Sequence, residues 1–289
     1  MELAVVVGNC QAAALEMLLN TNDEFSRRFE FSSFPPVHEI PAEMVAGLHE
    51  ALAVAKIVVL QRIDEGYRDG LGLGTETLAK VAGAATVVRW PSVYWAGYFP
   101  DLFYLRNENG DPVVDGPFDY HDRVILEGYV AGLGVAETIQ RLKDPGLPSN
   151  AQSWAESSTA ELEVRGKGCD VEITSFIASK FREELLFFTM NHPANVLLGH
   201  IATQVMDLTG IPGSIDHRKL PDQVLGSTFY PLHSNHARAL DLAFGSQAED
   251  PRFRIRGVSY QAVDVVEMFF DYYAEHPDLV ALNRDAAVL

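Results

Sequence analysis

The sequence predicts an α/β fold with a doubly wound, mainly parallel sheet, a large helical insertion and a helical C-terminal tail. Short β-branched runs alternate with amphipathic segments over residues 1–92, the pattern of parallel strands joined by helices. The run at 3–7 is followed at once by a helical pattern at 11–19, with Ala and Leu on one face. An aromatic stretch rich in Pro and Gly, over 91–118, then breaks the alternation.

The other elements of the predicted core follow from the same two periodicities. We predict further strands at 29–34, 56–60 and 85–90, and helices at 41–53 and 75–82. The run "LLFFTM" at 185–190 predicts that the sheet resumes after the insertion, and a helix follows over 194–208.

Helical patterns fill most of the insertion and reappear in the tail. They lie at 122–133, 135–143, 152–164, 170–182 and 260–273, with a Pro/Gly linker at 144–150. We therefore expect one domain over 1–289, with an α/β core of 1–92 and 183–210, a mainly helical insertion of 93–182 and a C-terminal extension of 211–289.

Composition narrows the class of partner. The net charge of -18 and the pI of about 4.8 disfavour nucleic acid and anionic lipid surfaces as ligands, although such acidity is also common in bacterial cytosolic proteins. No basic leader opens the chain and no stretch approaches the ~18 apolar residues of a membrane span. Cys10 and Cys169 cannot form a disulfide framework, so we expect a cytoplasmic protein.

One cysteine follows the first predicted strand directly, in the sequence Gly8-Asn9-Cys10-Gln11. Ligands of parallel α/β sheets bind beyond the carboxyl ends of the strands, and a helix N-terminus lowers the pKa of a thiol. The backbone N–H groups of Cys10 and Gln11 would form an oxyanion hole there, on a turn that Gly8 and Asn9 permit. The alternative is that Cys10 is a small buried hydrophobe.

A histidine follows the last predicted strand in the same way. In "TMNHPAN", His192 lies on the loop before a helix, where it could act as the base for Cys10. Asn191 or Thr189 could orient its imidazole, as Asn does in some Cys-His enzymes. The alternative for a lone histidine is a capping or packing role.

These two motifs resemble the WcbI family of bacterial capsule-polysaccharide biosynthesis proteins. The resemblance covers roughly residues 1–210 and includes "VVVGNCQ", "VVLQ", "RWPSVYWAGYFPD" and "FDYHDRVILEGYVAGLG". It implies coenzyme A or acyl-CoA as co-substrate, and acyl transfer to a sugar hydroxyl. The active pair of that family carries over to Cys10 and His192.

A more distant resemblance is to SGNH (GDSL-type) hydrolases and O-acetyltransferases, whose sheets are flavodoxin-like. They have Ser where this chain has Cys10, and an Asp-x-x-His-Pro block where this chain has "TMNHP". Thr189 stands in place of that Asp, so a Cys-His dyad, or a triad completed from elsewhere, replaces the usual triad.

Two arginines and an amide at the same sheet edge are candidates for cofactor binding. Arg62 and Arg89 could clamp the phosphates of a CoA donor, together with Gly8, Asn9 and Gln61 at the turn, the Gln61 amide serving as a further oxyanion donor. An ion pair with one of the 40 acidic residues is the alternative for each arginine.

Other motifs carry weaker signals. "GLGLGT" at 70–75 suggests a phosphate cradle but lacks the P-loop lysine, and a plain loop is favoured. "HRK" at 217–219 could meet a phosphate or be a solvated loop. "HSNH" at 233–236 has metal-ligand spacing but no third ligand in the sequence, so no metal is expected. Four aromatic residues could line an acceptor pocket or belong to the core: Tyr94, Trp95, Tyr98 and Phe99.

The sequence therefore predicts a CoA-dependent O-acyltransferase acting on a saccharide or similar small acceptor, with no nucleic-acid partner and no membrane span. Two enzymatic alternatives remain open: an SGNH-like esterase with a Cys nucleophile, and a transferase using another 3′-phosphonucleotide donor, such as a sulfotransferase. A non-enzymatic binding module is the third. The acceptor, the acyl chain and whether the chain is a homo-oligomer also stay open.

Overall fold

The computed structural model describes residues 1–114, 116–220, 222–245 and 252–284. Its chain divides into two compact units. The first, the sheet unit, comprises Met1–Tyr94, Thr159–Lys180 and His192–Leu225; the second, the helical unit, comprises Trp95–Ser158, Phe181–Asn191 and Gly226–Leu289. The sheet unit thus includes residues 159–180, which we expected in the insertion.

A four-stranded parallel sheet forms the centre of the sheet unit. Its order among the described residues is β2-β1-β3-β4, with strands Phe29–Phe31, Glu2–Val7, Ile57–Gln61 and Thr86–Trp90. The central strands are buried along almost their whole length because helices cover both faces, which explains their unbroken apolar sequences. The predicted α/β class with a parallel sheet is confirmed.

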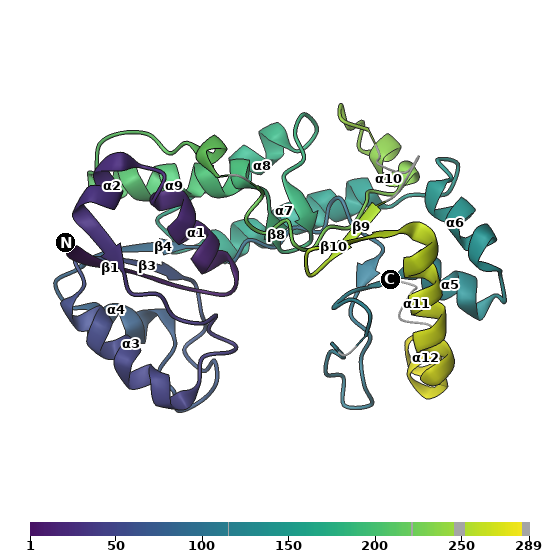
Figure 1. The fold of residues 1–289 in the computed structure, drawn as a ribbon, viewed down its shortest axis with the longest axis horizontal. Coiled ribbons are helices and arrows are strands. Elements are labelled where there is room, and N and C mark those ends of the chain that lie inside the picture. The colour runs from purple at the N-terminus through teal and green to yellow at the C-terminus, as the bar shows by residue number, and fades with distance from the viewer. Residues whose placement is uncertain (115, 221, 246–251, 285–289) are drawn as a thin grey trace. The chain divides into compact units, whose positions relative to one another are not determined.

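Helices cover the two faces of this sheet in pairs. Figure 1 shows α1 (Gln11–Leu19) and α9 (Asn195–Thr209) on one face, and α3 (Ala42–Val54) and α4 (Thr75–Ala82) on the other. Leu48 and Leu52 of α3 pack with Val5 and Val58 of the strands in a buried apolar cluster. The carboxyl ends of β1 and β3 therefore emerge between two helix layers, where a ligand is best sheltered.

Three short elements complete the sheet unit: α2 (Asp23–Arg28), α8 (Thr174–Lys180) and the 3-10 helix η1 (His217–Lys219). The sequence reading missed α2, although Asn22 is a typical N-cap whose side chain accepts a hydrogen bond from the N–H of Phe25. The expectation that the sheet resumes at 185–190 is wrong. Phe187–Thr189 forms a strand, β7, but this strand lies outside the four-stranded sheet.

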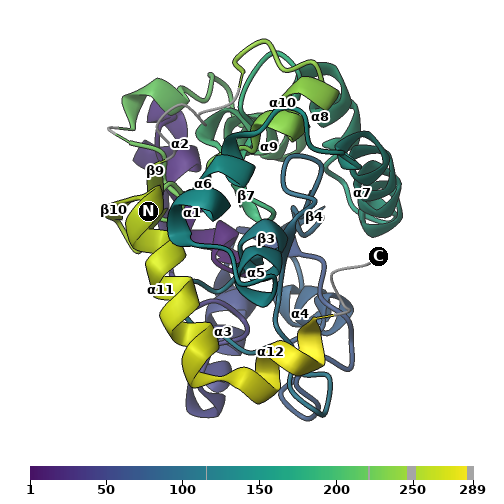
Figure 2. The same ribbon diagram turned by 90° about the vertical axis from the view of Figure 1, so that its right-hand side faces the viewer.

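The helical unit is held together by aromatic side chains. Its helices are α5 (Arg123–Val130), α6 (Val135–Lys143), α10 (Ser234–Ala239), α11 (Ala262–Glu275) and α12 (Pro277–Asn283). Figure 2 shows α11 beside α5 and α6. Short antiparallel pairs join β5 (Leu102–Phe103) to β6 (His121–Asp122) and β9 (Arg252–Ile255) to β10 (Val258–Gln261).

The helix α7 (Ala151–Gly166) contributes residues to both units. The β8 segment His192–Pro193 precedes α9 in the sheet unit. None of the helices in the described ranges combines the length and the apolar character that crossing a bilayer requires.

Candidate functional site

The strand order places the end of β3 beside the turn that contains Cys10. In a parallel sheet of order 2-1-3-4, the connections leaving β1 and β3 run to opposite faces, and ligands of such folds bind at the carboxyl ends of these two strands. The turn that follows β1 contains Cys10, and the residues that end β3 are Gln61 and Arg62. The two segments predicted to form the site are thus adjacent in the sheet.

A chain of amide hydrogen bonds fixes the GNCQ turn, which we define as Gly8, Asn9, Cys10 and Gln11. The N–H of Asn9 donates to Gln61 Oε1 at 2.9 Å, and Gln61 Nε2 donates to Gln11 Oε1 at 2.9 Å. Gln11 Nε2 in turn donates to the carbonyl of Val93 at 2.7 Å, and Asn9 Oδ1 accepts from the N–H of Gln11 at 3.0 Å. Both glutamines are buried, so these bonds form in a low-dielectric setting and hold the backbone rigidly.

Gly8 is required by the close approach of β3. A Cβ atom at this position would lie 3.0 Å from the Cβ of Gln61 and 3.1 Å from its Oε1. The glycine therefore lets the Gln61 amide reach the N–H of Asn9. The expectation that Gly8 allows a tight turn is replaced by a packing reason.

This network corrects the predicted roles of two amides. The N–H of Gln11 donates to Asn9, and both ends of the Gln61 amide are used inside the turn. This arrangement does not support the prediction that these groups donate to an oxyanion, because the N–H of Gln11 and one N–H of Gln61 Nε2 already have acceptors in the turn. They are framework residues that position Cys10.

The thiol of Cys10 is less acidic than the sequence predicted. Burial raises its pKa, and the nearby carboxylate of Glu39 raises it further. The backbone N–H groups of Cys10 and Gln11 lower the pKa, but their effect is smaller than that of burial. The prediction of a lowered pKa is wrong because burial outweighs the backbone N–H groups and, among the described residues, no cation lowers the pKa of this thiol, so Cys10 is a neutral thiol at pH 7.

Arg62 and Arg89 lie on one cavity at the carboxyl edge. This Arg62–Arg89 cavity has a volume of about 260 Å³ and is also lined by Lys167 and Cys169. Arg62 Nη1 donates to the carbonyls of Val164 and Arg165 in the last turn of α7 and of Lys167 just after it, at 2.8–3.2 Å. The structure thus brings together three cations that lie far apart in the sequence.

Carboxylates share this cavity with the cations. Arg89 pairs with Glu76 at 3.2 Å, which is the ion-pair alternative stated above, and Asp64 and Glu65 also line the wall. Glu65 Oε1 accepts from the N–H of Glu76 at the start of α4 at 2.8 Å. The proposed phosphate cradle at 70–75 is therefore capped by the protein's own carboxylate.

Cys169 is a member of this cavity that the sequence reading missed. It lies in the loop between α7 and α8. Burial raises the pKa of its thiol, whereas the charges of Arg62 and Arg89 oppose that rise. Cys169 is far from Arg62 and Arg89 in the sequence, so the sequence does not indicate that they line the same cavity.

His192 and Asn191 fall in different units. His192 is half-buried in β8 of the sheet unit, three residues before α9 begins, and α9 packs on α1, which Cys10 opens. In the helical unit, Asn191 Oδ1 accepts hydrogen bonds from the Tyr120 hydroxyl at 2.5 Å and from Thr189 Oγ1 at 3.1 Å. The pairing of His192 with Cys10 stays a prediction.

Comparison with known proteins shows the family of this chain. The sequence profile of the family described as polysaccharide biosynthesis enzyme WcbI matches residues 3–214. The chain belongs to the WcbI family. A search of curated proteins finds no match.

A solved structure of WcbI, described as a novel polysaccharide biosynthesis enzyme, has the same fold, with a TM-score of 0.84 at 23% identity. The alignment covers 99% of this chain and 95% of the other. That structure is described as native protein without a disulfide bond between CoA and one of its cysteines. The predicted resemblance to this family is confirmed.

Two of the weaker sequence signals in this WcbI-family chain have structural explanations. Trp95 and Tyr98 are fully buried and pack edge to face at 4.9 Å, with Phe99 beside them, so they belong to the core of the helical unit. In η1, Lys219 pairs with Asp23 at 2.9 Å and Arg218 with Asp216 at 2.9 Å. The "HRK" segment is thus part of a surface ion-pair arrangement.

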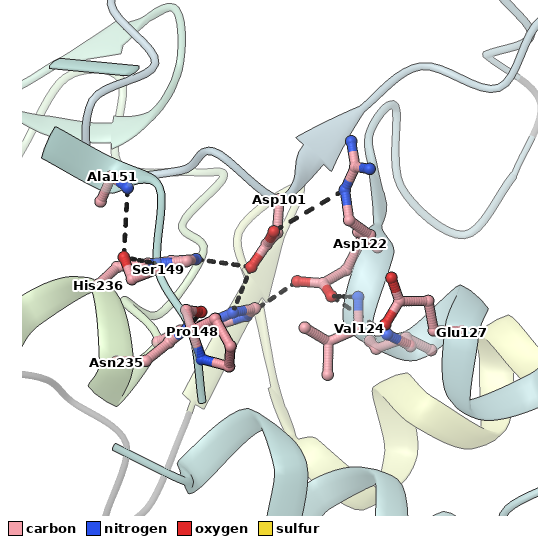
Figure 3. Close-up of polar contacts among 12 residues, drawn as sticks. Asp101, Asp122, Val124, Glu127, Pro148, Ser149, Ala151, Asn235 and His236 are labelled. Carbon is pink, nitrogen blue, oxygen red and sulfur yellow. Dashed lines mark hydrogen bonds and ion pairs between the residues drawn. The ribbon is translucent and has the colours of Figure 1, made fainter. Parts of the chain in front are cut away.

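A second polar cluster lies inside the helical unit of this WcbI-family chain. We define the Asp101 cluster as Asp101, Asp122, Ser149, His233 and His236. Figure 3 labels Asp101, Asp122, Ser149 and His236. Asp101 Oδ2 lies 2.6 Å from His236 Nε2 and 3.3 Å from His233 Nδ1. The "HSNH" spacing was set aside for want of a third ligand, and Asp101 supplies it from over 130 residues away in sequence.

Charge dominates the Asp101 cluster. Burial alone would lower the pKa of His233, but the carboxylates of Asp122 and Asp101 outweigh it and raise the pKa to about 10. Burial would raise the pKa of Asp101, yet hydrogen bonds and charge from the two imidazoles hold it well below its ordinary value. In this cluster, the negative charge of the carboxylates and the positive charge of the imidazoles therefore stabilise each other.

Proposed function

We propose that this protein transfers an acyl group from a CoA thioester to a hydroxyl of a sugar or a similar small acceptor. The observation that carries the proposal is the position of Cys10 on a rigid turn at the carboxyl edge of a 2-1-3-4 parallel sheet, with Arg62 following the neighbouring strand. Membership of a family of polysaccharide biosynthesis enzymes supports a saccharide acceptor. The CoA named for the WcbI structure supports the donor.

The Arg62–Arg89 cavity is suited to the phosphates of the donor. CoA carries a pyrophosphate and a 3′-phosphate, and planar guanidinium groups bind phosphate through paired hydrogen bonds. Arg62 is tethered by α7 carbonyls, so its charge is fixed in place at little further entropic cost. Arg89 would exchange its half-exposed partner Glu76 for a phosphate oxygen.

The raised pKa of Cys10 constrains the chemistry. A neutral thiol is a poor nucleophile, so a base must remove its proton or act on the acceptor directly. His192 fills that role in the proposal. It takes a proton from Cys10 or directly from the acceptor hydroxyl. In the direct route the acceptor oxygen bonds to the acyl carbon, the carbon–sulfur bond to CoA breaks, and the proton passes to the leaving CoA thiolate. In the route through Cys10 the same exchange first gives an acyl-cysteine thioester. His192 then takes the proton of the acceptor hydroxyl, the acceptor oxygen bonds to the acyl carbon as the bond to Cys10 Sγ breaks, and the proton returns to Cys10.

The oxyanion of the tetrahedral intermediate needs donors other than the two glutamine amides. With Gln11 N–H and Gln61 Nε2 engaged in the turn, the N–H of Cys10 is the donor we assign. One such donor is worth about 3 kcal/mol of transition-state stabilisation.

The test measures binding and turnover separately. Acetyl-CoA should raise the melting temperature of the protein. At an acetyl-CoA concentration 100 times its dissociation constant, the folded state should be stabilised by about 2.7 kcal/mol. Arg89→Ala should weaken CoA binding while shifting the apo melting point little, because an exposed ion pair contributes about 1 kcal/mol or less. Glu76→Gln should tighten CoA binding a few-fold, since it releases Arg89 and removes a negative charge.

Arg27→Ala is the matched control, because Arg27 forms an exposed ion pair with Glu24 on α2 and lines no part of this cavity. In turnover, release of the CoA thiol should depend on an added sugar acceptor. Acetate release without acceptor would instead indicate an esterase. A thermal shift with 3′-phosphoadenosine 5′-phosphosulfate and none with CoA or its esters would indicate a sulfuryl donor and overturn the assignment.

A further inference from the structure

Three side chains of the Asp101 cluster converge as metal ligands do. Asp101 Oδ2, one ring nitrogen of His233 and one of His236 all lie within 4.8 Å of one another. Ligand atoms on a tetrahedral zinc are about 3.3 Å apart when each lies about 2.0–2.1 Å from the metal. The separation of Asp101 Oδ2 from His233 Nδ1 is 3.3 Å, and that from His236 Nε2 is 2.6 Å.

The outer nitrogen of each imidazole is held by a second acceptor. His233 Nε2 lies 2.9 Å from Asp122 Oδ2, and Asp122 is itself fixed by the Tyr230 hydroxyl at 2.8 Å and the N–H of Val124 at 2.7 Å. His236 Nδ1 lies 2.9 Å from Ser149 Oγ. Outer partners of this kind set the tautomer of a ligating histidine and turn its other nitrogen toward the metal (Figure 3).

His233 is more than nine-tenths buried, and a carboxylate faces each of its ring nitrogens, Asp122 at 2.9 Å from Nε2 and Asp101 at 3.3 Å from Nδ1. The distance from Nδ1 to Asp101 suits two ligands of one ion better than a direct bond.

The cluster borders two cavities. One, of about 10 Å³, is lined by Asp101, Asp122, His233 and His236 together with apolar and tyrosine side chains, and is close to the size that holds one water molecule. The other, of about 470 Å³, is lined by Asp101, His236, Arg123 and Ser149 among others. The shared wall of Asp101 and His236 would give an ion here access to a ligand in the larger cavity.

We propose that Asp101, His233 and His236 form a binding site for one divalent transition metal ion, with Asp122 and Ser149 positioning the two imidazoles. Two nitrogen ligands and one carboxylate are the donor set of zinc and related ions and leave a coordination position for water or a ligand. The two buried carboxylates would balance the charge of a divalent ion bound by neutral imidazoles. This inference does not rest on the proposed acyl transfer.

The test uses the full chain, stripped with a chelator, dialysed against Zn²⁺ and then against metal-free buffer. Elemental analysis by mass spectrometry should find about one Zn²⁺ per chain. Asp101→Asn and His236→Gln should each lose it, whereas His38→Ala should retain it, because His38 is half-exposed and outside the cluster. Ser149→Ala should load zinc with roughly 10–100-fold weaker affinity.

Folding is checked by circular dichroism of each variant, and Co²⁺ loading provides an independent readout. Co²⁺ in the wild type should give visible absorption bands that the Asp101→Asn variant lacks. Wild-type protein that retains no stoichiometric metal and shows no Co²⁺ bands would overturn the proposal. So would one Zn²⁺ per chain that survives in both Asp101→Asn and His236→Gln, and the cluster would then be an ion-pair network alone.

Discussion

The GNCQ turn and the Asp101 cluster are both buried polar centres, but burial acts on them in opposite ways. In the turn, neutral amides satisfy one another, and burial keeps the Cys10 thiol neutral, since no cation in the described part of the chain compensates its ionisation. In the cluster, two carboxylates outweigh the burial of His233 and favour its charged form. The comparison shows that burial favours the neutral form of a titratable group unless nearby opposite charges together outweigh it.

The largest effect expected from this comparison concerns the neutral thiol. If Cys10 needs a base, Cys10→Ala and His192→Ala should each lower kcat/KM for acyl transfer by about 100-fold or more, and the double variant should lose little beyond that, because members of one catalytic unit are not additive. Steady-state CoA release with a sugar acceptor measures this. Arg27→Ala, which lies on α2 and lines no part of the Arg62–Arg89 cavity, is the control and should retain activity.

Cys10→Ser refines the same comparison. Substantial activity in Cys10→Ser, alongside a loss in Cys10→Ala, would favour direct transfer on a polar turn over an acylated cysteine. Wild-type activity in Cys10→Ala would remove Cys10 from the chemistry and leave the GNCQ turn as a binding element.

A smaller effect concerns the amide network that holds the turn. Gln61→Ala removes the acceptor of the buried N–H of Asn9, and we expect the free energy of unfolding to fall by about 1–3 kcal/mol. Urea denaturation measures the change. Gln140→Ala, on the exposed face of α6, should change stability by about 0.5 kcal/mol or less. A Gln61→Ala variant with unchanged stability and lost turnover would restore Gln61 as an oxyanion donor.

The elements near Cys10 were predictable because each depends on local sequence. The run at 3–7, the glycine after it and the helix at 11–19 encode a strand, a turn and an amphipathic segment within 17 residues, and the structure has α1 at those bounds. The side-chain partners of the turn were not predictable in the same way. Gln61 and Val93 reach Gln11 only after the parallel strands pair, and pairing register is a long-range property.

The Asp101 cluster shows more clearly what could not be predicted from the sequence. His233 and His236 were visible as a spaced pair, but Asp101, Asp122 and Ser149 come from three other segments that only the packing of the helical unit brings together. The β7 strand was misplaced for a related reason. An apolar run such as 185–190 indicates burial, whereas it does not indicate which sheet the strand joins.

The smallest expected effect concerns the pKa of the Cys169 thiol, on which burial and nearby positive charge act in opposite directions. Burial raises the pKa of this thiol and the charge of Arg62 lowers it, so Arg62→Ala should raise the pKa further. At a fixed pH below the pKa, the thiolate fraction falls tenfold for each unit by which the pKa rises. We therefore expect alkylation of Cys169 by iodoacetamide at pH 8 to slow by roughly 2–5-fold. Peptide mass spectrometry over time follows Cys10 in the same sample, and its rate should not change.

Arg62→Lys separates charge from structure in that experiment. Lysine keeps the positive charge but loses most of the hydrogen bonds that the guanidinium makes to the α7 carbonyls, so the alkylation rate of Cys169 should stay near that of the wild type. The rate should also rise with pH through and above the ordinary thiol pKa of about 8.5, because the raised pKa delays formation of the thiolate. Faster alkylation in both Arg62 variants would contradict the electrostatic explanation and show that Arg62 limits access of the reagent to the loop.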